Sequence, residues 1–270
     1  MISFPNAKIN LGLNITEKRN DGFHNISSCL YPVPLHDVLE INLSNKFSFE
    51  LSGWPIPGDK SHNLVIKAYN LLKKDFDLPN VAAHLHKNIP LEAGLGGGSS
   101  DGSFTLRMLN EFFELFLSDS VLEDYAGMLG SDCPFFIYNR PALVSGRGEE
   151  MEAFNLNLRG FHLYLVKPDV SISTKEAFRN IHARQPQVDI PVILSCNEPG
   201  AWAGNLKNDF EKVIFHHHPE LSEIKKKLYS LGALYASMTG SGSAFYGIFK
   251  DPPEFETGFP DRYFSWSGQL

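Results

Sequence analysis

The sequence predicts an α+β protein with two domains. Strand-like runs alternate with amphipathic helical patterns, but without the regular strand-helix-strand order typical of a parallel sheet. The chain has 270 residues, of which 43% are hydrophobic, which is enough for one large or two modest packed cores. We place the domains at residues 1–150 and 151–270, because a strand at 142–146 runs into a turn and a new strand begins at 161.

The first half contains most of the predicted elements. Alternating apolar residues predict strands at 7–16, 38–43 and 47–51, a helix follows at 64–72, and another strand lies at 81–86. Later in the chain, helices are expected at 121–129 and within 211–231, a strand at 161–166, and two strands around a turn within 233–249.

The segment after the strand at 81–86 is the most informative one. It contains Pro90, Leu91, Glu92, Ala93, Gly94, Leu95, Gly96, Gly97, Gly98, Ser99 and Ser100, and apolar residues at helical spacing follow it. Glycines let backbone N–H groups approach an anion, and a helix N-terminus adds roughly half a positive charge. A strand, a glycine loop and a helix in this order predict a phosphate site.

Several other interpretations of this loop fit less well. A flexible linker would have polar flanks, whereas these flanks are apolar. A Walker A loop needs a lysine before the serine, and here Gly98 directly precedes Ser99. The dinucleotide fingerprint needs a third glycine where Ser99 stands.

Composition excludes several classes of protein. A formal charge of −7 argues against binding to nucleic acid through a broad basic face. The three cysteines, Cys29, Cys133 and Cys196, predict neither a disulfide framework nor a metal site and suit a reducing cytoplasm. No export signal and no membrane span are expected, since no run of 18 apolar residues occurs.

Three further segments have both a functional and a structural interpretation. Gly240 lies in a Gly/Ser turn between two apolar runs, where a simple hairpin turn is equally plausible. Lys8 and Asn10 share one face of an apolar strand, although a lysine there usually faces solvent at a sheet edge. Asp132 follows Gly130 and Ser131 and could simply form a turn.

Together these segments resemble the GHMP superfamily of small-molecule kinases. That family has a lysine on its first strand, a loop like Pro90 to Ser100, and a late Gly-Ser-Gly turn, and the likeness extends from Pro5 to about Phe249. The segments Lys8 to Leu11 and Arg19 to His24 resemble the branch that phosphorylates 4-diphosphocytidyl-2-C-methyl-D-erythritol in the non-mevalonate route to isoprenoid precursors.

The resemblance implies a two-domain fold with the active site in a cleft between the domains, and phosphoryl transfer from ATP with Mg²⁺. Asp132 would accept or orient the proton of the substrate hydroxyl, and Lys8 would keep Asp132 ionised. The loop from Pro90 to Ser100 would hold the phosphates, and Asn63 and Lys87 would lie near adenine. Asp101 departs from the neutral residue common in the family, and its extra negative charge could favour the start of the helix or weaken phosphate affinity.

The resemblance also implies a pocket for the small-molecule substrate, cytidine-diphospho-methylerythritol. Phe23 and Phe178 would sandwich the cytosine, and His24 would bind its edge. The remaining substrate contacts would come from Asn10, Thr174 and Gly240. Phe23 stands where the family often has tyrosine, and Phe178 could instead be a helix core residue.

Two alternatives stay open at this point. A GHMP kinase for homoserine, a mevalonate derivative or a sugar would keep Lys8 and Asp132 but leave Phe23 and His24 without a role. A nucleotide-binding protein without catalysis would also keep the fold. The sequence predicts no oligomeric state.

Overall fold

A computed structural model describes residues 1–179, 181–253 and 258–270. Its contacts group the chain into two compact units. Unit 1 comprises Met1–Ala7, Leu35–Leu91 and Gly96–Arg140, and unit 2 comprises Lys8–Pro34, Glu92–Leu95 and Pro141–Leu270. The grouping is discontinuous along the chain, whereas the predicted division at residue 150 is sequential.

Unit 1 contains a four-stranded sheet with the order β1-β4-β6-β5. Its strands are β1 (Ile2–Ser3), β4 (Val38–Leu43), β5 (Ser48–Gly53) and β6 (Val81–Lys87). Strand β4 pairs antiparallel with β1 and β6, and β5 runs parallel to β6. Along β6 every second side chain is buried, from Val81 through Ala83 and Leu85 to Lys87. A strand with one covered face produces this period of two.

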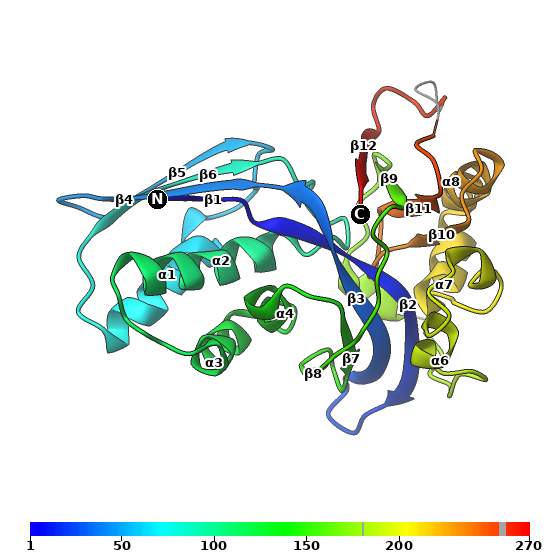
Figure 1. The fold of residues 1–270 in the computed structure, drawn as a ribbon, viewed down its shortest axis with the longest axis horizontal. Coiled ribbons are helices and arrows are strands. Elements are labelled where there is room, and N and C mark those ends of the chain that lie inside the picture. The colour runs from blue at the N-terminus through cyan, green and yellow to red at the C-terminus, as the bar shows by residue number, and fades with distance from the viewer. Residues whose placement is uncertain (180, 254–257) are drawn as a thin grey trace. The chain divides into compact units, whose positions relative to one another are not determined.

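Four helices and a short 3₁₀ turn complete the described part of unit 1. They are η1 (Lys60–His62), α1 (Leu64–Asp75), α2 (Gly97–Phe112), α3 (Asp119–Leu129) and α4 (Cys133–Tyr138). Figure 1 shows α1 and α2 beside one another against the sheet. Leu39 and Leu85 of the sheet, Val65 of α1 and Leu106 and Leu109 of α2 are buried in one apolar core.

Unit 2 contains two further four-stranded sheets, with the orders β2-β3-β7-β8 and β10-β11-β9-β12. Their strands are β2 (Asn6–Lys18), β3 (His24–His36), β7 (Ala142–Ser145), β8 (Glu150–Ala153), β9 (His162–Lys167), β10 (Tyr235–Met238), β11 (Phe245–Phe249) and β12 (Phe264–Gln269). The first residues of β2 and the last of β3 belong to unit 1.

The helices of unit 2 follow β9 in the chain. They are α5 (Thr174–Arg179), α6 (Ile190–Leu194), η2 (Pro199–Ala201), α7 (Asp209–His217) and α8 (Pro219–Ser230). Buried side chains of α7 and α8, among them Phe210, Ile214 and Leu221, share a core with Leu13 and Ile15 of β2. This core therefore joins residues from both ends of the chain.

The predicted α+β class is confirmed, and so are the strands at 7–16 and 38–43 and the helix at 64–72, now β2, β4 and α1. The sequence pattern does not predict β3, because Pro32 and Pro34 interrupt it and proline is rare in central strands. It also does not predict β12, which forms by pairing with β9. In the described ranges, no helix has both the length and the apolar character needed to cross a membrane.

Candidate active site

The glycine loop continues directly into the first turn of α2. The helix begins at Gly97, earlier than the glycine-rich composition suggests, and Gly96 precedes it in the left-handed conformation at φ 70°. The first backbone bond of this turn is the one that the Ser100 N–H donates to the Gly96 carbonyl, at 2.9 Å. Because no side chain among the described residues caps this end, the N–H groups of Gly97, Gly98 and Ser99 are available to an anion.

The surroundings of this first turn differ from residue to residue. A Cβ atom at Gly98 would meet no atom within 4 Å, so its backbone borders open space. A Cβ at Gly97 would lie 2.9 Å from the Ile89 side chain, so this glycine allows α2 to approach the end of β6. The hydroxyl of Ser100 is buried and has no hydrogen-bond partner among the described residues. It therefore fits a bound oxygen ligand or cation.

Beneath this turn lies a buried cluster of charges. The Nζ of Lys87 donates to Asp101 Oδ2 at 2.7 Å and also to Asp37 Oδ2. Burial lowers the pKa of Lys87, but the carboxylates of Asp101 and Asp37 outweigh this effect and raise it. Asp37 also accepts the N–H groups of Asn88 and Ile89, at 2.6 and 2.8 Å, through its other oxygen.

This cluster changes two expectations about the nucleotide site. The Lys87 side chain is fully buried on Asp37 and Asp101, which differs from the predicted contact with ATP. Asp101 faces Lys87 rather than presenting an extra charge to a phosphate, so the expected weakening of phosphate affinity loses its basis.

Asp132 and Asn63 stand at the starts of helices in unit 1. Asp132 precedes α4, is half-buried, and does not cap the helix with its carboxylate. A carboxylate at this position can serve as a proton acceptor. Asn63 precedes α1 and its Oδ1 accepts the Val65 N–H at 2.9 Å, so the oxygen predicted to lie near adenine already caps the helix.

Lys8 is held within unit 2 by its neighbour on the same face of β2. Its Nζ donates to Asn10 Oδ1 at 2.6 Å, and only 3% of Lys8 is exposed. The amide of Asn10 in turn donates to Ser28 Oγ at 2.9 Å. The predicted pairing of Lys8 and Asn10 on one face is thus present, and the Asn10 side chain orients Lys8 rather than facing solvent.

The first part of the glycine loop contacts the late glycine turn. Lys8 N–H donates to the Leu95 carbonyl at 2.9 Å, and the Thr239 hydroxyl donates to the Gly94 carbonyl at 3.1 Å. Gly94 has φ 73°, and a Cβ there would lie 2.1 Å from the Thr239 carbonyl oxygen. Only glycine permits this approach. Three segments that are distant in sequence therefore meet at Gly94 and Thr239.

The residues predicted to bind the base lie in unit 2 in a modified arrangement. His24 stacks on Phe178 with ring centroids 5.1 Å apart, whereas Phe23 is 56% exposed and lies 5.2 Å from the Arg147 guanidinium. Phe178 therefore supports His24 in this structure, which differs from the predicted sandwich of a base between Phe23 and Phe178. Burial, with a smaller effect from Lys18, lowers the pKa of His24.

Thr174 and Gly240 lie close together, as predicted. Thr174 stands at the start of α5, and its hydroxyl is 3.4 Å from the hydroxyl of Ser241, the residue after Gly240. An exposed hydroxyl beside a glycine turn can bind a polar ligand. The predicted site residues fall into both units, with Asp132, Asn63 and Lys87 in unit 1 and Lys8 and the proposed substrate contacts in unit 2.

Comparison with known proteins assigns the chain to a family. Residues 63–140 match the model of the GHMP kinase N-terminal domain, and residues 196–257 match that of the GHMP kinase C-terminal domain. A 4-diphosphocytidyl-2-C-methyl-D-erythritol kinase from Bacteroides fragilis strain YCH46 is 51% identical over 253 residues, 92% of each chain. The chain belongs to the GHMP kinase family.

Other GHMP kinases extend this result. A relative with the same description from Bacteroides thetaiotaomicron is 49% identical and covers 100% of both chains. A crystal structure of a 4-(cytidine 5'-diphospho)-2C-methyl-D-erythritol kinase has a TM-score of 0.81 at 29% identity, covering 92% of this chain and 90% of the other. Mevalonate kinase from Methanococcus jannaschii has a TM-score of 0.73 at 12% identity, covers 100% of this chain and 98% of its own, and shows the shared fold alone.

Sequence reasoning overlooked three residues that the site depends on. Asp37, Asn208 and Thr239 are buried and make several hydrogen bonds each, but the sequence pattern indicated no role for any of them, although Thr239 stands beside Gly240 in the predicted Gly/Ser turn. Asn208 precedes an amphipathic helix, which identifies it as a cap but says nothing about its second set of contacts. Those contacts join residues about 30 positions apart, so a local pattern could not reveal them.

Proposed function

We propose that this chain transfers the γ-phosphoryl group of ATP to the 2-hydroxyl of 4-diphosphocytidyl-2-C-methyl-D-erythritol. The products would be the 2-phosphate and ADP, in the methylerythritol phosphate route to isoprenoid precursors. Relatives with this description match at 45–51% identity over at least 92% of the chain. We place the reaction in the cytoplasm, a reducing compartment that suits the three cysteines.

The observation that carries the kinase assignment is the uncapped first turn of α2. The N–H groups of Gly97, Gly98 and Ser99 and the N-terminal end of the helix dipole form a cradle for phosphate. Gly98 borders open space, so a phosphate oxygen can approach its backbone. Phosphoryl transfer depends mainly on positioning and charge neutralisation, and this turn supplies both.

The chemical step is proposed to rest on Asp132 and Lys8. Asp132 would accept the proton from the attacking hydroxyl, which makes the oxygen a better nucleophile. Lys8, held by Asn10 at 2.6 Å, would favour the ionised form of Asp132 and stabilise the transferring charge. Asn10, first expected to touch the substrate, would act by fixing the Lys8 ammonium.

Magnesium is proposed to accompany ATP. The described residues contain no group of three or more His, Cys, Asp or Glu side chains able to hold a metal ion, so Mg²⁺ would bind mainly to phosphate oxygens. The buried Ser100 hydroxyl, which lacks a partner, fits as one protein ligand. When bound, the ion would neutralise charge on the phosphates.

The cytidine end of the substrate is proposed to bind around His24. The stacked ring of Phe178 orients the imidazole, which can then bind the edge of the base. The exposed ring of Phe23 offers a flat face for stacking. Thr174 and Gly240 would contact the rest of the substrate, and Asn63 and Lys87 would lie near adenine.

The test is a coupled assay of ADP release with Mg-ATP and four acceptors. The panel contains 4-diphosphocytidyl-2-C-methyl-D-erythritol, homoserine, mevalonate and galactose. We expect ADP release with the cytidine compound alone, with its 2-phosphate detected by mass spectrometry. Turnover of another acceptor would overturn the proposed substrate, and ATP binding without turnover of any acceptor would contradict the proposed reaction.

A further inference from the structure

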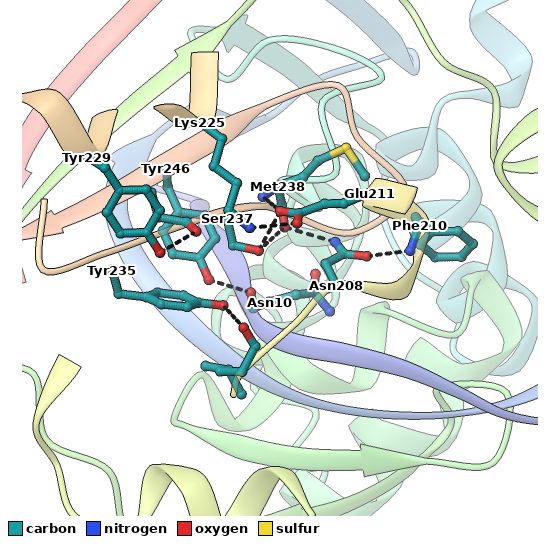
Figure 2. A network of polar contacts seen from close by, with 12 residues as sticks. Asn10, Asn208, Phe210, Glu211, Lys225, Tyr229, Tyr235, Ser237, Met238 and Tyr246 are labelled. Carbon is teal, nitrogen blue, oxygen red and sulfur yellow. Dashed lines mark hydrogen bonds and ion pairs between the residues drawn. The ribbon is translucent and has the colours of Figure 1, made fainter. Parts of the chain in front are cut away.

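We propose that Asn208 is a positioning residue that holds the Met238–Gly240 backbone in the geometry needed to bind the acceptor substrate. The inference rests on the proposed function, because Gly240 is one of the proposed substrate contacts. Figure 2 shows Asn208 between Met238 and Phe210, at the centre of a network of polar contacts. All the residues of this network lie in unit 2.

The Asn208 side chain joins two elements at once. Its Nδ2 donates to the carbonyls of Met238 and Gly240, at 2.9 and 2.8 Å. Its Oδ1 accepts the Phe210 N–H at 3.0 Å and so caps α7. With 3% exposure, the side chain has little access to water. Both protons of the amide are therefore used to hold the turn, in addition to the cap that the sequence predicts.

Glu211, one turn further along α7, holds the same backbone from its other side. Its Oε1 accepts the Met238 N–H at 2.9 Å and the Ser237 hydroxyl at 3.1 Å, and its Oε2 pairs with Lys225 at 2.6 Å. The N–H of Met238 is thus bound by a side chain of α7, and its carbonyl by the residue that caps this helix (Figure 2). This fixes the end of β10 relative to the start of the helix.

The turn at Thr239 also contacts two other segments of the proposed site, the glycine loop at Gly94 and strand β2 at Asn10. Thr239 Oγ1 accepts the Asn10 N–H at 3.0 Å and donates to the Gly94 carbonyl at 3.1 Å. Tyr246 donates to the Asn10 carbonyl at 2.7 Å. Because Asn10 holds Lys8, a shift of the turn would move both the glycine loop at Gly94 and the strand that carries Lys8. A misplacement of about 1 Å can reduce the rate of an enzyme by about 100-fold.

The first test is Asn208→Asp. Aspartate is as good a helix cap as asparagine, so α7 is preserved, but it has no N–H groups for the carbonyls of Met238 and Gly240. We expect kcat/KM for the acceptor to fall by about 10- to 100-fold. The matched control is Ser118→Ala, which removes the cap of α3 in unit 1 and lowers stability without altering the turn.

Hydrogen exchange supplies a readout that does not depend on the substrate. The N–H groups of Thr239 and Gly242 donate within the turn, to Ala244 and Thr239 at 3.0 Å each. In Asn208→Asp these two amides should exchange faster than in the wild type, and in Ser118→Ala they should not. If no acceptor is phosphorylated by the wild type, the proposed function fails, and this comparison still tests the positioning role.

If Asn208→Asp does not fold, two variants of Thr239 test the contacts between the turn and the proposed site. Thr239→Val removes the hydroxyl that contacts Asn10 and Gly94, whereas Thr239→Ser retains it. We expect kcat/KM for the acceptor to fall about 10- to 100-fold in the first variant and to recover mostly in the second. Wild-type kcat/KM and exchange in Asn208→Asp, or equal losses in the two Thr239 variants, would overturn the proposal.

Discussion

Asp37 and Asp101 share one buried lysine, so the cluster they form holds one carboxyl group more than Lys87 can neutralise. Burial raises the pKa of Asp101 well above its usual range, Lys87 counteracts this, and Asp37 adds to it. One oxygen of Asp101 also has no partner among the described residues. Two carboxyl groups beside one lysine disfavour the ionisation of both, so the pKa of Asp101 lies above its usual range.

Asparagine should therefore replace Asp101 at little cost. We expect Asp101→Asn to change the free energy of unfolding by about 1 kcal/mol or less, since asparagine keeps the shape of the side chain and removes the carboxyl group in excess over Lys87. Asp37→Asn should cost about 3 kcal/mol or more, because the carboxylate of Asp37 pairs with Lys87 and binds two backbone N–H groups. Urea unfolding measures both values.

The difference in stability between the wild type and Asp101→Asn should change with pH in a predictable direction. The folded-state pKa of Asp101 is raised, so its contribution to stability is complete below the unfolded pKa and is lost as pH rises through the folded pKa. The stability of the wild type relative to Asp101→Asn should therefore decrease as the pH rises above about 4, the usual pKa of an aspartate. An opposite slope would show that Asp101 is ionised in the folded protein.

Asp132 should affect turnover rather than nucleotide binding. Asp132→Asn keeps the shape of the side chain but removes the base, so kcat should fall by about 100- to 10,000-fold. The affinity for ATP, measured by calorimetry, should change by no more than about 3-fold. Asp124→Asn, an exposed carboxylate on α3, is the control and should leave both values unchanged. A wild-type kcat in Asp132→Asn would remove Asp132 from the mechanism.

His24 should control recognition of the cytidine substrate. His24→Ala should raise the acceptor KM by about 10-fold or more, because a buried polar edge of the base would lose its partner. The lowered pKa keeps the ring neutral below the usual value of about 6.5, so the wild-type KM should rise only at lower pH. Steady-state kinetics from pH 5 to 8, with His24→Gln as a variant that does not titrate, test this. An effect on ATP alone would contradict the assignment.

At the scale of elements, the first turn of α2 combines helix formation with access to an anion. Gly98→Ala should raise the free energy of unfolding by up to about 1 kcal/mol, because alanine favours helix and its Cβ would meet no atom within 4 Å. The same methyl group would occupy the space proposed for phosphate, so KM for ATP should rise about 10-fold.

Gly127 provides a matched control for this substitution. It lies within α3, where a Cβ would also meet no atom within 4 Å. Gly127→Ala should therefore give a similar gain in stability and leave KM for ATP unchanged. Thermal unfolding and initial-rate kinetics of the two variants measure the comparison. Equal KM values for ATP would show that phosphate does not approach Gly98.

Elements with strong periodicity could be predicted, and those defined by pairing could not. The helix α1 and the strand β6 follow from apolar residues at periods of 3.6 and 2. Strand β3 contains two prolines, and β12 is a short, half-exposed strand that pairs with β9 over six residues. Neither carries enough local information, because the partner strand is distant in sequence.

At the scale of the whole molecule, the two compact units are interleaved along the chain. The core of unit 2 includes Leu13 and Ile15 of β2, although most of its residues follow position 141. A cut at residue 150 would therefore separate this core from one of its strands. The division into an N-terminal GHMP kinase domain at residues 1–150 and a C-terminal one at residues 151–270 stays a prediction. The two units defined by contacts have different boundaries.

A fragment of residues 151–270 should therefore not fold by itself. It lacks Leu13 and Ile15, and we expect weak dispersion of amide resonances and no cooperative unfolding transition. Adding a fragment of residues 1–150 should restore a cooperative transition, since it supplies β2. A stable, cooperatively folded fragment of residues 151–270 would show that β2 is dispensable for this core.

The sequence by itself determined the α+β class, the glycine loop with its helix, and the lysine strand, since these depend on local periodicity and residue type. Its resemblance to the GHMP kinases, confirmed by comparison, also indicated the family. The tertiary structure alone decided that Lys87 is buried on Asp37 and Asp101, that His24 stacks on Phe178, and that Asn208 holds the turn at Gly240. These contacts join residues far apart in the chain, and only folding brings their partners together.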